Sequence, residues 1–196
     1  MRAGMNRSYS VLIVSAPGKS ADGLTEMLRS PEYAPLTVVG GADAARRLLV
    51  GKSYDIIVVN APLPDDFGTQ LALDLAADSS SGILMLVKGE MYEEASVRTA
   101  SSGVLVLPKP NTRQAILAAV RLVAATNDRL RAMEAKTENL RSRFEEMRLV
   151  NRAKWLLIDR LKMTEADAHR YIEKQAMDLC QRRRDVAESI IKMYEL

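Results

Sequence analysis

The sequence has little of what metal, thiol and membrane chemistry require. Its 196 residues contain one cysteine, Cys180, and one histidine, His169, which argues against an internal disulfide and a His/Cys zinc site. The two residues lie eleven apart on what reads as one helix, far from any glycine-rich loop, so a Cys–His nucleophile is not expected. No apolar run approaches the roughly 20 residues of a membrane span, and residues 1–10 lack the apolar core of a signal peptide. We expect a protein of the reducing cytoplasm that uses no metal or cofactor and is not an enzyme.

Aromatic residues are also scarce, at 5%, with a single tryptophan. With 47% hydrophobic and 27% charged residues, the chain still has the composition of a folded globular protein of one large or two small domains. The net charge of +3 is spread unevenly: residues 1–110 carry −2, residues 111–150 carry +3 and residues 151–196 carry +2. The positive surplus of the C-terminal half favours a polyanionic partner there.

The first 110 residues alternate short apolar runs with helical patterns. The runs are apolar throughout, as expected for strands that are buried on both faces of a parallel sheet. The alternation predicts an α/β fold with a five-stranded, doubly wound parallel sheet whose site lies at the carboxyl ends of the strands. The predicted strands are Tyr9–Val14, Leu36–Val39, Asp55–Val59, Ile83–Val87 and Val104–Leu107, and the predicted helices are Ser20–Arg29, Ala42–Val50, Phe67–Ala77 and Tyr92–Ser101.

Glycine and proline are absent from residues 111–196, and a long helix is expected after a cap at Asn111 or Thr112. Apolar residues then recur in alternating steps of three and four, which is the heptad pattern of a coiled coil. Such a helix is too long to cover its apolar seam on one small domain, so we predict a dimeric coiled coil over residues 113–150; the alternative is a helix that folds back on its own domain. The predicted dimer seam contains Val123, Leu130, Met133, Leu140, Phe144 and Met147, with Thr126 and Thr137 between them and Asn151, Lys154 and Ile158 in the same register.

Residues 151–196 predict a separate bundle of three short helices. Lys162-Met163-Thr164 interrupts the first helix, and Thr164 with Asp167 resembles a capping box that starts the second. The run Arg182–Arg184 precedes the third helix.

The N-terminal segment, residues 9–112, resembles the receiver domain of response regulators in two-component signalling, a flavodoxin-like fold. The loop from Asn60 to Gly68, with Pro64 between them, matches the receiver loop after the third strand, and Lys109-Pro110 matches the pair after the fifth. Asn60, however, occupies the position of the phosphorylated aspartate, and an amide cannot form an acyl phosphate.

The other positions of the receiver site also depart from the family. Ser15 and Ala16 replace the acidic pair that holds Mg²⁺, Val87 replaces a hydroxyl residue and Val106 replaces an aromatic one. Of the family's site only Lys109 is retained, so the resemblance implies a pseudo-receiver whose degenerate phosphorylation site is Ser15, Ala16, Asn60, Val87 and Lys109. The alternative is that Asp65 or Asp66 serves as a displaced phosphate acceptor.

The C-terminal segment resembles the ANTAR domain of AmiR/NasR-type antiterminators. The match rests on Ala153-Lys154, Thr164, Ala168-His169, Ala176-Met177 and Val186-Ala187 at the family's spacing. The resemblance implies a homodimer that binds a hairpin in a nascent leader RNA and so promotes transcription antitermination. It also allows a ligand-sensing protein partner that sequesters the dimer.

Basic residues of this module are the candidates for RNA contact. Trp155 departs from the small residue of the family, and it either stacks on an unpaired base or, the interpretation we favour, fills space between helices. Two other functions stay open: a DNA-binding response regulator, which the ANTAR pairs disfavour, and a protein-interaction scaffold. The predicted RNA-binding residues are Arg152, Lys154, Trp155, Lys162, Arg170, Lys174, Arg182, Arg183 and Arg184.

Overall fold

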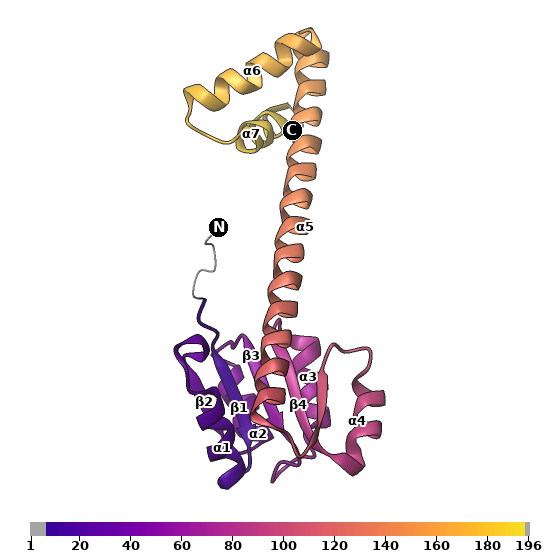
Figure 1. Ribbon diagram of the computed structural model, residues 1–196. Helices are drawn as coiled ribbons and strands as arrows, with labels where there is room; N and C mark the ends of the chain where they lie inside the picture. Colours follow the sequence, from indigo (N-terminus) through magenta and orange to yellow (C-terminus); the bar gives the residue numbers. More distant parts are fainter. Residues whose placement is uncertain (1–6, 195–196) are drawn as a thin grey trace. The chain divides into compact units, whose positions relative to one another are not determined.

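A computed structural model describes residues 7–194, which divide into two compact units (Figure 1). The N-terminal unit ends at Arg131 and the C-terminal unit begins at Ala132. The long helix α5 (Arg113–Leu161) contributes to both, and each unit is described with its own part of this helix. Within the described residues, no helix is long and apolar enough to cross a membrane. The predicted segment limits at residues 112 and 150 stay predictions.

The N-terminal unit is built on a five-stranded parallel sheet in the order β2-β1-β3-β4-β5. The five predicted strands are confirmed, and each begins and ends within two residues of its predicted limits. Their core positions are apolar because β1, β3 and β4 are buried on both faces. The strands are β1 (Val11–Ser15), β2 (Leu36–Val39), β3 (Ile56–Asn60), β4 (Gly82–Lys88) and β5 (Leu105–Lys109).

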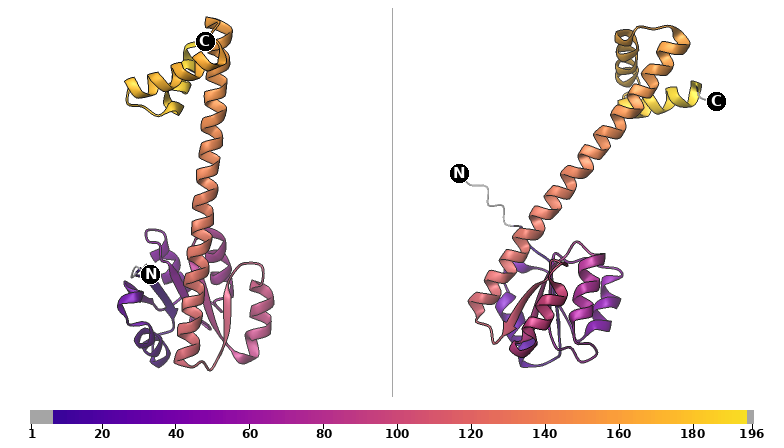
Figure 2. Two further views of the ribbon diagram at one scale, coloured as in Figure 1. Left: turned by 45° about the horizontal axis from the view of Figure 1, so that its top comes forward. Right: turned by 90° about the vertical axis from the view of Figure 1, so that its right-hand side faces the viewer.

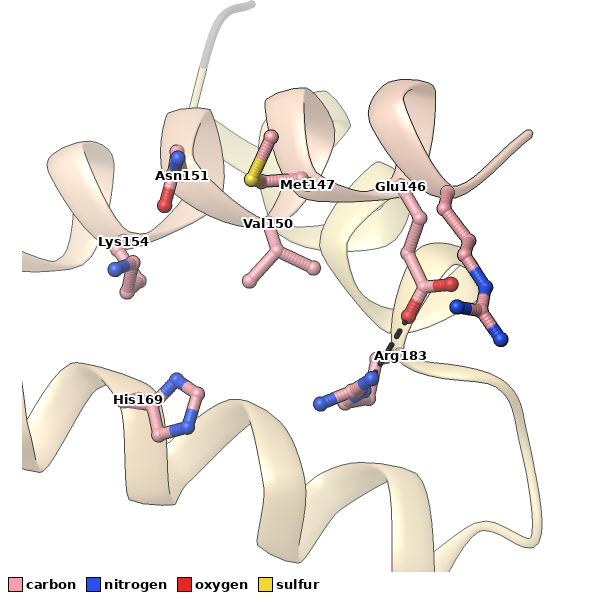
Figure 3. Close-up of a pocket in the computed structure, with 8 residues that line it drawn as sticks. Glu146, Met147, Val150, Asn151, Lys154, His169 and Arg183 are labelled. Atoms are coloured by element: carbon pink, nitrogen blue, oxygen red, sulfur yellow. Dashed lines mark ion pairs between the residues drawn. The ribbon is translucent and has the colours of Figure 1, made fainter. Parts of the chain in front are cut away.

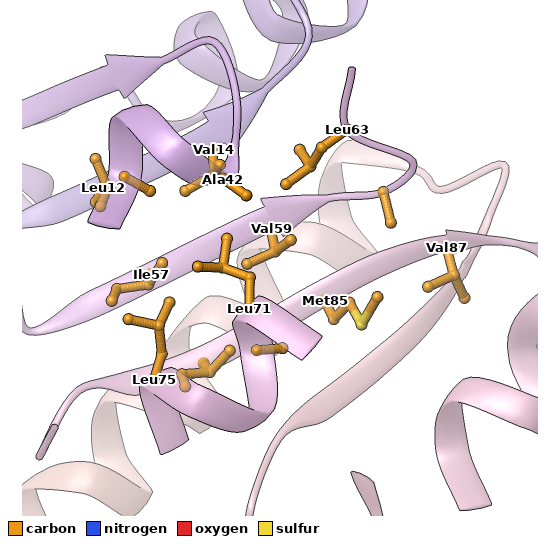
Figure 4. Packing of buried hydrophobic residues seen from close by; sticks show 14 of the residues in the cluster. Leu12, Val14, Ala42, Ile57, Val59, Leu63, Leu71, Leu75, Met85 and Val87 are labelled. Carbon is orange, nitrogen blue, oxygen red and sulfur yellow. The ribbon is translucent and has the colours of Figure 1, made fainter. Parts of the chain in front are cut away.

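Helices cover both faces of this sheet (Figure 2). One core cluster packs beneath α2 (Ala42–Leu49), α3 (Thr69–Asp78) and α4 (Tyr92–Thr99), and Figure 4 shows Leu71 and Leu75 of α3 against Val59 and Met85 of the sheet. The other cluster packs beneath α1 (Lys19–Leu28) and the first turns of α5. Two short 3₁₀ turns, Pro31–Tyr33 and Gly89–Met91, complete the unit.

The first part of α5 belongs to this sheet core. Val123 is only 8% exposed and packs with the α1 face, so it is not available to the dimer seam in which the heptad pattern placed it. The close approach depends on Gly82 at the start of β4, because a Cβ there would overlap the Val123 side chain. The seam prediction failed at this position because a heptad pattern does not distinguish a helix that packs on a sheet from one that packs on another helix.

Polar contacts fix the same stretch of α5 at the amino ends of the strands. Arg131 Nη1 lies 2.5 Å from Asp55 Oδ1, and Asn127 Nδ2 donates to the Asp55 carbonyl oxygen at 3.2 Å. The Asp55 carboxylate also accepts the Ser10 backbone N–H at 2.9 Å. This cluster anchors α5 to the N-terminal unit up to Arg131.

The C-terminal unit consists of the rest of α5 with α6 (Glu165–Asp178) and α7 (Arg183–Tyr194), as the predicted three-helix bundle requires. Ala153 and Leu157 of α5, Ala168 and Ile172 of α6, and Ala187 of α7 are at most 1% exposed and form its core. The predicted cap is confirmed, since the Thr164 hydroxyl accepts the Asp167 backbone N–H at 3.2 Å. Lys162 turns the chain between α5 and α6 with a φ of 54°.

Candidate nucleic-acid interface and degenerate phosphorylation site

The carboxyl ends of β1, β3 and β5 bring the pseudo-receiver residues together. The register pairs Ser15 with Asn60, and both are buried, at 0% and 6% exposure. Asn60 Nδ2 donates to Ser15 Oγ at 2.9 Å, and Lys109 Nζ donates to Asn60 Oδ1 at 2.9 Å and to the Ala61 carbonyl oxygen. The Lys109 ammonium therefore donates to an amide oxygen and a carbonyl oxygen, which are neutral. In a site with aspartates it would donate to carboxylates.

Burial and the charge of nearby Lys88 lower the pKa of Lys109. Val87 and Val106 are buried at 0% and 8% exposure and add no polar group to the site. Across the described residues, no cluster of three His, Cys, Asp or Glu side chains could hold a metal ion. The side chains of Ser15, Asn60 and Lys109 form a closed hydrogen-bonded network at the strand ends.

The two aspartates of the β3–α3 loop have structural partners. The Asp65 carboxylate accepts the backbone N–H groups of Ala42 and Asp43 at 2.9 Å each, which caps the first turn of α2 and holds the pKa of Asp65 below its ordinary value. Gly41 leaves room for this contact, because a Cβ there would lie 2.5 Å from Asp65 Oδ1. Asp66 accepts the Gly68 backbone N–H at 2.6 Å.

A groove of about 590 Å³ lies within the C-terminal unit, between α5 and the N-terminal turns of α6 and α7 (Figure 3). One wall is α5, from which Val150 and Lys154 point toward the facing helix, while Met147 and Asn151 lie at the outer edge of the groove. The facing wall has His169 from α6 and Arg183 from α7, and Arg143 and Glu146 complete the lining. With three formal cations and one carboxylate, the groove suits an anionic ligand that also presents an apolar face, such as a nucleotide.

Of the predicted RNA-binding residues, only Lys154 and Arg183 share this groove. Both hold carboxylates: Lys154 Nζ lies 3.1 Å from Glu165, while Arg183 lies 3.3 Å from Glu146 and 3.8 Å from Glu173. The Lys154 side chain is 16% exposed, so it is the more enclosed of the two.

The other predicted cations are dispersed over the unit. Arg170 pairs with Asp167 at 2.8 Å, Arg182 with Asp185 at 3.3 Å, and Arg184 with Glu188 at 2.9 Å. Arg152 lies on a different flank of α5, while Lys162 and Lys174 are exposed.

Trp155 is 71% exposed, so it does not fill space within the helix bundle of its own chain. It lies two residues beyond the buried Ala153 and two before the buried Leu157, which places it on the opposite side of α5 from the bundle core. The sequence placed it in a helix but gave no sign of which face of that helix the bundle uses.

Two groove residues, Arg143 and His169, were not among the predicted RNA contacts. Arg143, Met147, Val150 and Lys154 follow one another at helical spacing, and this spacing was the signal that could have found Arg143. His169 lies 3.3 Å from Glu173 on the surface of α6, and its place in the groove depends on how α6 packs on α5.

Comparison with known proteins agrees with this architecture. Residues 138–191 match the ANTAR domain family. The chain thus carries an ANTAR domain after a receiver-like fold, which is the domain order of an ANTAR response regulator. It is 27% identical to the transcriptional regulatory protein PdtaR of Mycobacterium tuberculosis over 86% of this chain and 82% of that one.

Solved structures support the same fold. The response regulator StyR superposes with a TM-score of 0.66 at 19% identity and covers 94% of this chain and 98% of its own. A signal receiver domain of an HD domain-containing protein from Pseudomonas fluorescens gives a TM-score of 0.58 at 21% identity, covering 67% and 97%. An adenylate cyclase structure from Rhodopirellula baltica gives 0.62 at 20%, covering 67% and 98%. At these identities the likeness concerns the fold alone.

Proposed function

We propose that this protein binds hairpins of nascent leader RNA through its C-terminal unit and promotes transcription antitermination as a homodimer. The observation that carries the proposal is the coincidence of the ANTAR match, residues 138–191, with a groove that presents Lys154 and Arg183 beside the apolar side chain of Val150. The name of the relative PdtaR, a transcriptional regulatory protein, supports a role in transcription.

The ion pairs of the groove shape how RNA would bind. Lys154 is paired with Glu165, and Arg183 is paired with Glu146. For either cation to bind RNA, a phosphate oxygen must replace the carboxylate. Each pair keeps one well-exposed partner, Glu165 at 77% and Arg183 at 51%. Ion pairs in contact with water are worth little, about 0–1 kcal/mol each, so a polyanion that releases counterions can replace them. The remaining proposed contacts, which lie outside the groove, are Arg152, Trp155, Lys162, Arg170, Lys174, Arg182 and Arg184.

A binding assay with matched nucleic acids tests this proposal against its alternatives. Fluorescence anisotropy compares a library of RNA hairpins with randomised loops, the same hairpins in DNA, and duplex DNA. The proposal expects binding to a subset of the RNA hairpins that exceeds binding to either DNA. Preference for duplex DNA would favour a DNA-binding response regulator, and no binding at all would favour a protein scaffold.

We also propose that the N-terminal unit is not phosphorylated on aspartate. Support comes from the amide at position 60, whose Oδ1 accepts from Lys109, and from the backbone N–H groups whose hydrogen bonds Asp65 and Asp66 accept. Intact-mass measurement after incubation with acetyl phosphate and Mg²⁺ is expected to show no phosphoryl adduct, and an acid-labile adduct contradicts the proposal. Control would then come from elsewhere, for example from a protein partner that sequesters the dimer.

A further inference from the structure

One face of α5 in the C-terminal unit is apolar and uncovered. Met133, Leu140, Phe144, Met147 and Trp155 are between 52% and 71% exposed. At 3.6 residues per turn, these five lie within a sector of about 80°, roughly opposite the core residues Ala153 and Leu157. We call these five residues the apolar stripe. It extends the predicted seam to Trp155, well inside the residues that match the ANTAR family.

The size of the apolar stripe fits a second copy of this chain. Five large side chains at this exposure offer on the order of 500 Å² of apolar surface per copy. A specific interface buries about 800 Å² per partner, which the stems of flanking residues would nearly supply. The surface therefore falls slightly short of a standard interface, as expected for a weak dimer.

The charges beside the apolar stripe oppose that dimer. Lys136 and Arg143 line one edge, each directly before a seam position, and Arg141 and Arg148 line the other, each directly after one. All four are exposed, and none forms an ion pair with another described residue. In a parallel pair Lys136 faces Arg141 of the second copy and Arg143 faces Arg148, while the acid Glu134, which precedes Arg141 on the same edge, faces Arg129. Two of these three pairs therefore place like charges where stable coiled coils place opposite ones.

We propose that the stalk, residues 132–161, is a conditional dimerisation element: a second copy seats on the apolar stripe, but repulsion between the flanking cations keeps the free dimer weak until phosphates of bound RNA neutralise them. The coupling to RNA rests on the proposed function; the repulsion itself does not. RNA binding and dimerisation then reinforce one another, since each phosphate placed between the copies removes a repulsion and each dimer presents a doubled set of cations.

Sedimentation velocity of the full chain, without nucleic acid, tests the repulsion. Salt screens exposed charges, so the dimer dissociation constant is expected to fall as NaCl rises from low to moderate concentration. Lys136→Glu replaces two repulsive pairs of the symmetric dimer by attractive ones and should tighten the dimer about tenfold at low salt while flattening its salt dependence. Ala135→Glu, which adds an acid on the outward side of the same helix, should keep the salt dependence of the wild type.

A second experiment measures dimerisation in the presence of heparin, a polyanion other than RNA. Heparin should shift the wild type toward dimer at low salt and shift Lys136→Glu less. A dimer that weakens with salt, a wild type and Lys136→Glu that dimerise equally, or chains that stay monomeric under all conditions would each overturn the proposal. Absence of hairpin RNA binding, measured separately, would remove the proposed function and leave the salt and Lys136→Glu results to decide the repulsion alone.

Discussion

The two units of this protein hold the cations of their candidate sites in opposite ways. In the N-terminal unit, Lys109 donates to neutral oxygens inside a closed network with Asn60 and Ser15. In the C-terminal unit, Lys154 and Arg183 line an open groove and pair with surface carboxylates that a ligand can displace. A cation that is satisfied internally stabilises a fold, whereas a cation with an exchangeable partner remains available for binding.

The largest expected effect is on the small core that supports the groove. Leu157→Ala removes a side chain that is 1% exposed and should destabilise the C-terminal unit by about 2–5 kcal/mol. Because that unit is short, we expect its helical signal to be lost at low denaturant and RNA binding with it, while the sheet persists. Urea titration followed by circular dichroism measures this. Met177→Ala, at a site 71% exposed, should change stability by less than about 0.5 kcal/mol; equal effects of the two changes would contradict the assigned core.

The next effect tests whether Lys109 is structural. Lys109→Met leaves Asn60 Oδ1 and the Ala61 carbonyl oxygen without their donor, which should cost about 1–3 kcal/mol of unfolding free energy. Chemical denaturation of the N-terminal unit measures the loss. Lys88→Met is the matched control, because Lys88 is exposed and acts on Lys109 only through its charge. A Lys109 variant as stable as this control would show that the network contributes nothing.

A smaller effect concerns the exchangeable cations. Lys154→Ala and Arg183→Ala should each lower the slope of log affinity against log salt by about 0.7 for an unpaired RNA loop, since each removes one phosphate contact. Anisotropy titrations at several salt concentrations, with a hairpin selected from the library, give the slope. Lys192→Ala, exposed on α7 and outside the groove, should leave it unchanged. Slopes equal to the wild type in all three would exclude the groove as the phosphate site.

The smallest expected effect tests whether Asp65 has a structural role as the cap of α2. The Asp43 and Ala42 N–H groups lower the pKa of Asp65, so its contribution to stability is present above the unfolded-state pKa of about 4 and is lost as the pH falls through the folded-state pKa. The Asp65→Asn variant has no titrating group at this position. Between pH 5 and pH 3 its melting temperature should therefore fall less than that of the wild type, and the difference corresponds to the stabilisation lost when one carboxylate is protonated. An equal fall in both proteins would contradict the capping role.

The sequence predicted the sheet and the order of modules well because continuous apolar runs and helical periodicity are local signals. It failed where the answer depends on which surface meets a helix. Val123 satisfies the heptad pattern yet packs on the sheet beside Gly82, and Trp155 has helical spacing yet faces away from the bundle. The groove was predicted only in part for the same reason: Lys154 and Arg183 were expected contacts, whereas His169 reaches the groove through the packing of α6 on α5.

The most direct test of this account measures the affinity of the full chain for one selected RNA hairpin before and after incubation with acetyl phosphate and Mg²⁺. The account predicts that binding occurs without the phosphodonor and is unchanged by it, because the C-terminal unit keeps its exchangeable cations while Asn60 accepts no phosphoryl group. Binding that appears only after treatment, together with a phosphorylated aspartate, would contradict it.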